Sequence, residues 1–129
     1  MKPRLLLDTC ALVWLATGDT KLSGDARAAV ATADSVYVSP VSAWELGQKY
    51  RRGILKLPVP PCELFRTAVE RYSLDIAPLA PEVMFAASAL PEYHKDPADR
   101  FIIATALLGH MAVVTADHRF REYGVEVLG

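Results

Sequence analysis

The sequence predicts a three-layer α/β sandwich, in which helices cover both faces of a central parallel sheet. Short apolar runs of strand length alternate along the chain with longer segments of helical periodicity. A strand–helix–strand order requires right-handed crossovers, which make the strands parallel. The 129 residues are enough for one hydrophobic core, so we expect a single domain over residues 1–129.

Five apolar runs bounded by turn residues predict the strands of this sheet. They cover residues 4–8, 36–38, 74–79, 112–115 and 125–128. The run over 74–79 is the weakest, because Pro78 cannot donate a ladder hydrogen bond.

Six segments have helical periodicity, and a helical turn follows them. They cover residues 9–17, 24–33, 41–52, 62–72, 81–90 and 99–108, with the turn over 118–123. Ser23 is a favoured N-cap for the second helix, and Gly53 and Gly109 are expected to end the third and the sixth. The expected apolar face of the third helix consists of Ala43, Leu46, Gly47 and Tyr50.

The composition excludes a disordered chain and a membrane span. Hydrophobic residues make up 52% of the chain and charged residues 22%. The net charge is −1, so the chain lacks the overall positive charge that is typical of nucleic-acid-binding proteins. Cys10 and Cys62 have no metal-ligand or disulfide-framework spacing, so we expect both to be buried in a reducing compartment. The N-terminal apolar run resembles a signal peptide, but Asp8 interrupts it, so we expect a cytoplasmic protein.

Four acidic residues are expected at one edge of the sheet. Asp8 and Asp117 each follow an apolar strand, Glu45 lies in the first turns of the helix after the second strand, and Asp99 lies in the first turn of the sixth helix. The carboxyl ends of parallel strands meet at one edge, where such sheets bind ligands.

Each aspartate taken alone also suits a helix cap. Asp8 and Asp117 precede helical segments, and Asp96 and Asp99 suit the N-cap and N3 positions around Pro97. Capping does not require convergence, however, and converging carboxylates repel one another. A divalent cation such as Mg²⁺ or Mn²⁺ removes that cost and can activate water for phosphodiester hydrolysis. Both explanations stay open at this point.

Four segments together resemble PIN-domain ribonucleases, and more narrowly the VapC toxins of VapBC toxin–antitoxin systems. They are LLLDTCALVWL, SPVSAWELGQKYRRGILKLP, HKDPADRFIIATAL and VVTADHRFREYGVEVL, in the family's order from Leu5 to Leu128. The resemblance implies an α/β/α sandwich with a central parallel sheet of four to five strands. It also implies a Mg²⁺- or Mn²⁺-dependent endoribonuclease that forms a homodimer and is inhibited by a VapB antitoxin.

The resemblance also assigns roles to the acids. The family's catalytic quartet maps onto Asp8, Glu45, Asp99 and Asp117. Three of these are expected to hold the metal ion, namely Asp8, Asp99 and Asp117. The run DPAD offers two aspartates, and we favour Asp99 because the apolar segment 101–108 follows it, which leaves Asp96 as the cap. Thr9 and Thr115 resemble hydroxyl residues that orient carboxylates or waters.

The basic residues, tryptophans and histidines also have expected roles. The densest basic cluster contains Lys49, Arg51 and Arg52, which could contact RNA phosphates or stabilise a helix C-terminus. Arg100 is expected to pair with an acid, and Trp14 and Trp44 to lie in the core or an interface. The histidines fit no zinc spacing and are expected to be solvated: His94, His110 and His118.

Two other functions fit parts of this pattern. A response-regulator receiver needs an acidic pair after the first strand and a late lysine, whereas Asp8 stands alone and no lysine follows Lys95. A PIN-like module that binds RNA or protein without cutting it would not need all four acids. Metal-dependent cleavage distinguishes that module from a nuclease.

Overall fold

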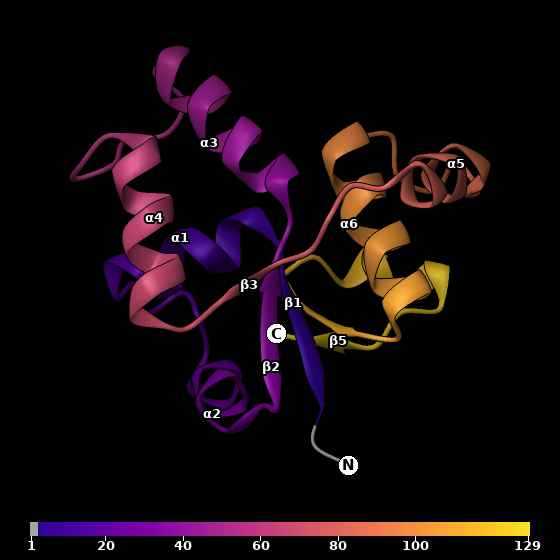
Figure 1. Ribbon diagram of the computed structural model, residues 1–129, viewed down its shortest axis with the longest axis horizontal. Coiled ribbons are helices and arrows are strands. Elements are labelled where there is room, and N and C mark those ends of the chain that lie inside the picture. The colour runs from indigo at the N-terminus through magenta and orange to yellow at the C-terminus, as the bar shows by residue number, and fades with distance from the viewer. Residues whose placement is uncertain (1–2) are drawn as a thin grey trace.

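The computed structural model describes residues 3–129, and a sheet of five parallel strands lies at its centre (Figure 1). The strand order is β3-β2-β1-β4-β5. The strands are β1 (Arg4–Leu7), β2 (Ser35–Val38), β3 (Asp75–Ile76), β4 (Ala112–Val114) and β5 (Val127–Leu128). In the middle strand, Leu6 pairs with Tyr37 of β2 on one side and with Val113 of β4 on the other. The parallel sheet expected from the sequence is confirmed.

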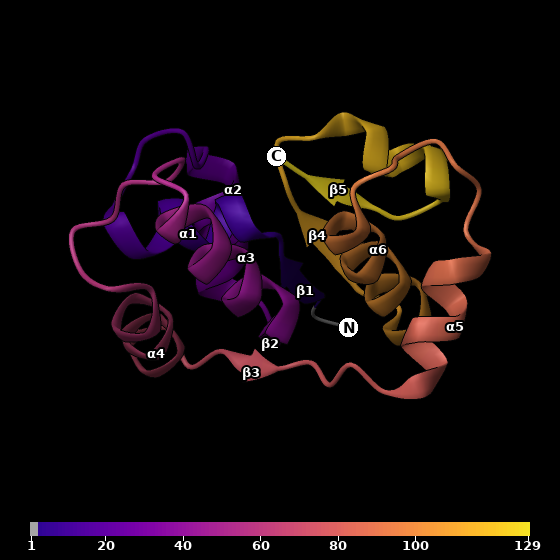
Figure 2. The same cartoon turned by 90° about the horizontal axis from the view of Figure 1, so that it is seen from above.

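Helices cover both faces of this sheet. They are α1 (Thr9–Thr17), α2 (Gly24–Thr32), α3 (Pro40–Arg51), α4 (Pro61–Arg71), α5 (Pro81–Ala89), α6 (Pro97–Gly109) and the 3₁₀ helix η1 (His118–Tyr123). Figure 2 shows α1 to α4 on one side of the sheet and α5, α6 and η1 on the other. Within residues 3–129, no helix has the length and apolar character needed to cross a bilayer.

The middle strand explains why the predicted strands are continuous apolar runs. Leu5 and Leu7 lie in the core beneath α1 to α4, where they share a cluster with Leu12. Leu6 lies in the core on the opposite face, with Ile102 of α6. All three leucines of β1 are fully buried, because a parallel strand covered on both faces has no polar side.

The two edge strands are shorter than expected. β3 and β5 have two residues each, against the predicted runs over 74–79 and 125–128. An edge strand pairs on one side only, and Pro78 has no N–H to extend β3.

The ends of α6 also differ from the prediction. The helix begins at Pro97 instead of at residue 99, because Asp96 Oδ1 accepts the Ala98 N–H (3.0 Å) as an N-cap and Pro97 suits the first position. It continues through Gly109, and His110, with a φ of 52°, adopts the left-handed conformation that ends it.

Two expectations about burial are wrong. Cys10 and Cys62 are both exposed, since α1 and α4 turn other residues toward the core. The buried residues of α3 are Val41, Ser42, Glu45 and Leu46. Of the predicted apolar face of α3 only Leu46 is buried, because this helix packs its Glu45 side against the start of α1, where the Thr9 hydroxyl bonds to Glu45.

Candidate metal centre

Four acidic side chains meet at the carboxyl edge of the sheet. Asp8 follows β1, Asp117 lies just after β4, Glu45 is on α3 and Asp99 is in the first turn of α6. They line one cavity of about 320 Å³. Its wall consists of Asp8, Thr9, Cys10, Trp14, Glu45, Lys49, Asp96, Asp99, Ala116, Asp117 and Phe120. Parallel α/β sheets bind their ligands at this edge.

Two of these acids also cap the helices that follow them. The Ala11 N–H donates to Asp8 Oδ1 (2.8 Å), and the Arg119 N–H donates to Asp117 Oδ1 (3.0 Å). The N–H groups of these strand-to-helix turns hold the carboxylates in place. Capping and convergence therefore occur together at the same residues.

Glu45 is buried, but both of its carboxylate oxygens have partners. The Thr9 hydroxyl donates to Glu45 Oε1 and also lies 2.9 Å from Ser42 Oγ. Lys49, one turn later on α3, places its Nζ 3.3 Å from Glu45 Oε2. This hydroxyl and ammonium pair offsets the cost of burying a carboxylate.

A histidine connects the other two acids. His94 Nε2 forms a hydrogen bond with Asp117 Oδ2 (3.1 Å) and lies 3.1 Å from Asp99 Oδ2. One ligand atom from each of these three residues lies within 4.8 Å of the others, close enough to surround a metal ion. On the solvent side, Arg119 Nη2 lies 2.8 Å from Asp117 Oδ2.

The surroundings shift the pKa values of these acids in opposite directions. Burial raises the pKa of Asp8 above its ordinary value. Burial, together with the nearby Asp96 carboxylate, raises the pKa of Asp99 to about 7. Hydrogen bonds from Arg119 hold the pKa of Asp117 well below its usual range. Burial thus disfavours the ionised forms of Asp8 and Asp99, and a bound divalent cation would favour them and lower both pKa values.

Comparison with known families identifies the domain that contains this cavity. The family model of the PIN domain matches residues 5–126. The chain belongs to the PIN domain family. It is also 31% identical to Ribonuclease VapC22 of Mycobacterium tuberculosis over 120 residues, which cover 92% of this chain and 91% of that protein. The family expected from the sequence is confirmed.

Solved structures share this PIN fold. The crystal structure of VapBC2 from Rickettsia felis, bound to a DNA fragment from their promoter, has a TM-score of 0.72 at 15% identity, with 97% of both chains covered. The crystal structure of FitAcB from Neisseria gonorrhoeae has a TM-score of 0.68 at 20% identity, with 97% of this chain and 96% of that chain covered. These likenesses confirm the predicted α/β/α architecture.

Two residues expected to support the PIN site lie beside its acids. Thr115 is buried, its side chain lowers the pKa of Asp8 against the larger effect of burial, and its Oγ1 accepts the Asp117 N–H (3.0 Å). Asp96 caps α6 and also lines the cavity, so it stands close to Asp99. Thr115 thus links the residues that follow β1 and β4.

One residue of the basic cluster and one tryptophan line the cavity, and the others lie on the outer surface. Lys49 lines the cavity, whereas Arg51 and Arg52 are exposed at the end of α3, outside the cavity wall. Trp14 packs partly against the core and lines the cavity. Trp44 is 62% exposed, which leaves it available for an interface instead of the core.

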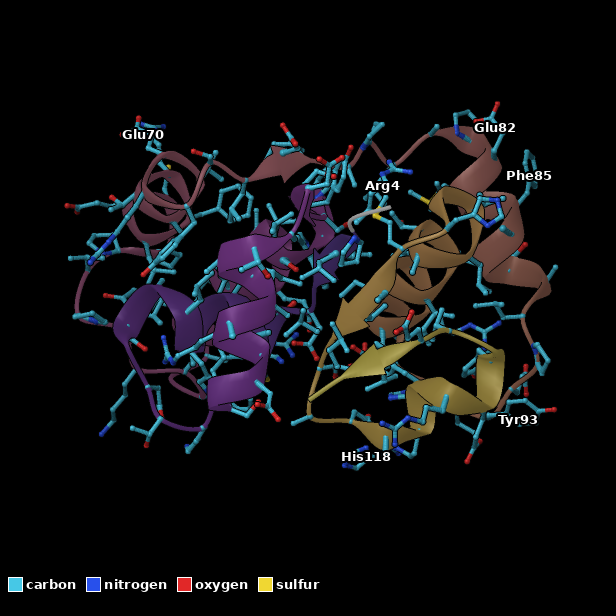
Figure 3. The ribbon with its side chains drawn as sticks, turned by 90° about the horizontal axis from the view of Figure 1, so that it is seen from below. Arg4, Glu70, Glu82, Phe85, Tyr93 and His118 are labelled. Carbon is cyan, nitrogen blue, oxygen red and sulfur yellow. The ribbon has the colours of Figure 1, made fainter. Side chains whose placement is uncertain are left out.

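Two expectations about residues near the acidic cavity, His94 and Arg100, are wrong. His94 is not solvated but 6% exposed, and its backbone N–H donates to Tyr123 Oη (2.7 Å). Within residues 3–129 Arg100 forms no ion pair with an acid, and its guanidinium donates instead to four backbone carbonyl oxygens. Figure 3 shows the neighbouring Tyr93 on the loop beside η1, and His118 on the outer side of η1, where it is exposed as expected.

The sequence offered little signal for the role of His94. The loop over 91–96 has no periodicity, and tertiary contacts hold it: Arg100 donates to the carbonyl oxygens of Pro91 and His94, and the His94 N–H donates to the Tyr123 hydroxyl. The position of His94, two residues before the helix cap, is its one local clue.

Proposed function

We propose that this chain is a metal-dependent endoribonuclease, the toxin component of a toxin–antitoxin system, and that residues 1–129 act as one PIN domain. One observation carries the proposal: four carboxylates from separate parts of the chain converge in one cavity at the carboxyl edge of the sheet. Similarity to Ribonuclease VapC22 supports RNA as the substrate.

The donor set of the cavity fits Mg²⁺ or Mn²⁺. Asp8, Asp99 and Asp117 would hold the ion through carboxylate oxygens, the hard ligands that these cations prefer. The raised pKa values of Asp8 and Asp99 fit this assignment, because a bound cation would offset the cost of ionising these buried carboxyls. When bound, the ion would polarise a phosphoryl oxygen and lower the pKa of a nearby water.

The side chains of the cavity position the reacting groups. Asp8 is oriented by the Ala11 N–H, and Glu45 by Thr9 and Lys49. We assign catalysis to Asp8, Glu45, Asp99 and Asp117. A water oxygen attacks the phosphorus in line, its proton passes to a carboxylate of this group, and the bond from phosphorus to the leaving oxygen breaks.

The basic residues of α3 provide a path for the RNA backbone. Lys49 lines the cavity, and Arg51 and Arg52 continue along the same helix end, so phosphates entering the cavity would meet all three. The salt dependence of RNA binding tests this path.

We also propose a VapB-type antitoxin and a second copy of this chain as partners. The VapBC2 and FitAcB structures, which share the fold, support an antitoxin. Two large apolar side chains offer surfaces for such partners: Trp44, exposed on α3, and Phe85, exposed on α5. Figure 3 shows Phe85 on the outside of α5.

Cleavage of total RNA by the purified protein tests the proposal, with Mg²⁺ or Mn²⁺ compared with EDTA. Discrete fragments that require both the metal and Asp8 are expected, so Asp8→Asn should lose them. Asp34→Asn is the matched control, because Asp34 is exposed and precedes β2, at the opposite edge of the sheet. If folded protein free of any partner binds RNA but cleaves none of it, the chain is the non-catalytic PIN-like module instead.

A further inference from the structure

His94 occupies the space between two of the proposed metal ligands. Its side chain is 7% exposed, and Nε2 lies 3.1 Å from both Asp99 Oδ2 and Asp117 Oδ2. A group at this position either coordinates a metal together with the two carboxylates or donates a proton between them. The two possibilities require opposite tautomers of the ring.

The other ring nitrogen indicates which tautomer is present. The Asp96 backbone N–H donates to His94 Nδ1 (3.4 Å), so Nδ1 carries a lone pair and not a proton. In the neutral ring the proton is then on Nε2, the atom that faces Asp99 and Asp117. A histidine that binds a metal through Nε2 instead donates its Nδ1–H to an acceptor.

The protein holds this ring firmly. The backbone of His94 is anchored at both ends, by the Tyr123 hydroxyl on its N–H and by Arg100 on its carbonyl oxygen (3.2 Å). The ring stands edge-on to Phe120, with centroids 5.9 Å apart. Arg100 also ties the loop to the end of α5 through the carbonyl oxygens of Ala87 and Leu90. The donor therefore reaches the acids with little freedom to turn away.

We propose that His94 is a positioning residue, whose Nε2–H donates to Asp117, faces Asp99 at the same distance, and keeps these carboxylates at the spacing that a divalent cation needs. The inference rests on the proposed metal site. Two carboxylates this close repel each other, and an N–H that faces both reduces the repulsion without adding a ligand of its own. Removing partners that orient metal ligands typically costs about 10- to 100-fold in metal affinity.

Isothermal titration of Mn²⁺ into the full chain, without RNA, tests the proposal with two substitutions. His94→Phe keeps a ring against Phe120 but removes the donor, and it is expected to weaken Mn²⁺ binding about 10- to 100-fold. His94→Gln places an amide N–H near the position of Nε2 and is expected to retain most of the affinity. His118→Phe, at an exposed histidine, is the control and should bind like the wild type. Thermal unfolding of each variant checks that it is folded.

Two patterns of affinity would overturn the proposal. Equal Mn²⁺ affinity of the wild type and His94→Phe would show that the carboxylates need no shared donor, while leaving the nuclease proposal intact. Equal losses in His94→Phe and His94→Gln would show that the imidazole itself is required, as a ligand would be.

Nitrogen-detected NMR of the histidine ring gives an independent answer. The proposal predicts a proton on Nε2, which stays there when Mg²⁺ is added. A proton on Nδ1, or loss of the Nε2 proton on addition of Mg²⁺, would overturn it. A wild type that binds no Mn²⁺ would contradict the proposed function, and the ring spectrum would still decide whether His94 donates to the two acids.

Discussion

Replacing Asp99 with asparagine is expected to stabilise the fold in EDTA, although it removes a proposed metal ligand. The side chain is 22% exposed, and burial beside Asp96 raises its pKa from 3.8 to about 7. Because the folded state binds this proton more tightly than the unfolded chain, the contribution of Asp99 to stability is greatest below pH 3.8 and falls as the pH rises to about 7. At about 1.36 kcal/mol per pKa unit, and allowing for solvent screening, ionised Asp99 costs roughly 2–4 kcal/mol.

Urea denaturation in EDTA measures this cost. At about pH 8 the Asp99→Asn protein is expected to exceed the wild type by roughly 2–4 kcal/mol in free energy of unfolding, and the difference should close near pH 4. Saturating Mn²⁺ should make the wild type more stable than Asp99→Asn, because Mn²⁺ stabilises only a folded protein that binds it. Asp34→Asn, at an exposed carboxylate, should change little. If Asp99→Asn is no more stable than the wild type in EDTA at about pH 8, the ionised Asp99 carboxylate does not destabilise the fold.

Three further perturbations test other parts of the site. Thr9→Val keeps the shape of the side chain but removes the hydroxyl that bonds to Glu45. Urea denaturation should show that the free energy of unfolding falls by roughly 1–3 kcal/mol. An unchanged midpoint would mean that buried Glu45 does not need this hydrogen bond. Arg119→Gln should let the pKa of Asp117 rise toward its usual range, and a carboxyl titration by NMR that matches the wild type would contradict the ion pair. Arg52→Gln should reduce the slope of log affinity against log salt for RNA by about one, and an unaltered slope would remove Arg52 from the RNA path.

The meeting of the acids was predictable because parallel topology determines it. Asp8 and Asp117 come immediately after apolar runs, and any parallel sheet that contains both runs brings the two carboxylates to one edge. The choice between Asp96 and Asp99 had a local basis as well, since Pro97 at the first helical position makes Asp96 the cap. In each case a residue's place in its own element decided its location.

The contacts of His94, Arg100 and Cys10 could not be predicted in this way. Arg100 follows an aspartate, which suggests an ion pair, but its guanidinium donates to carbonyl oxygens at the end of α5 and in the next loop. That tertiary arrangement carries His94 into the site. Cys10 is apolar enough for a core, yet its position on α1 turns it toward the cavity. Such outcomes depend on how elements pack, which periodicity does not record.

Anomalous diffraction from crystals grown with Mn²⁺ tests most directly whether the acidic cavity is a metal centre. A strong anomalous peak is expected inside the cavity, with carboxylate oxygens of Asp8, Asp99 and Asp117 within about 2.5 Å of it. An empty cavity at saturating Mn²⁺, or Mn²⁺ bound only elsewhere on the surface, would mean that these carboxylates do not form a metal centre.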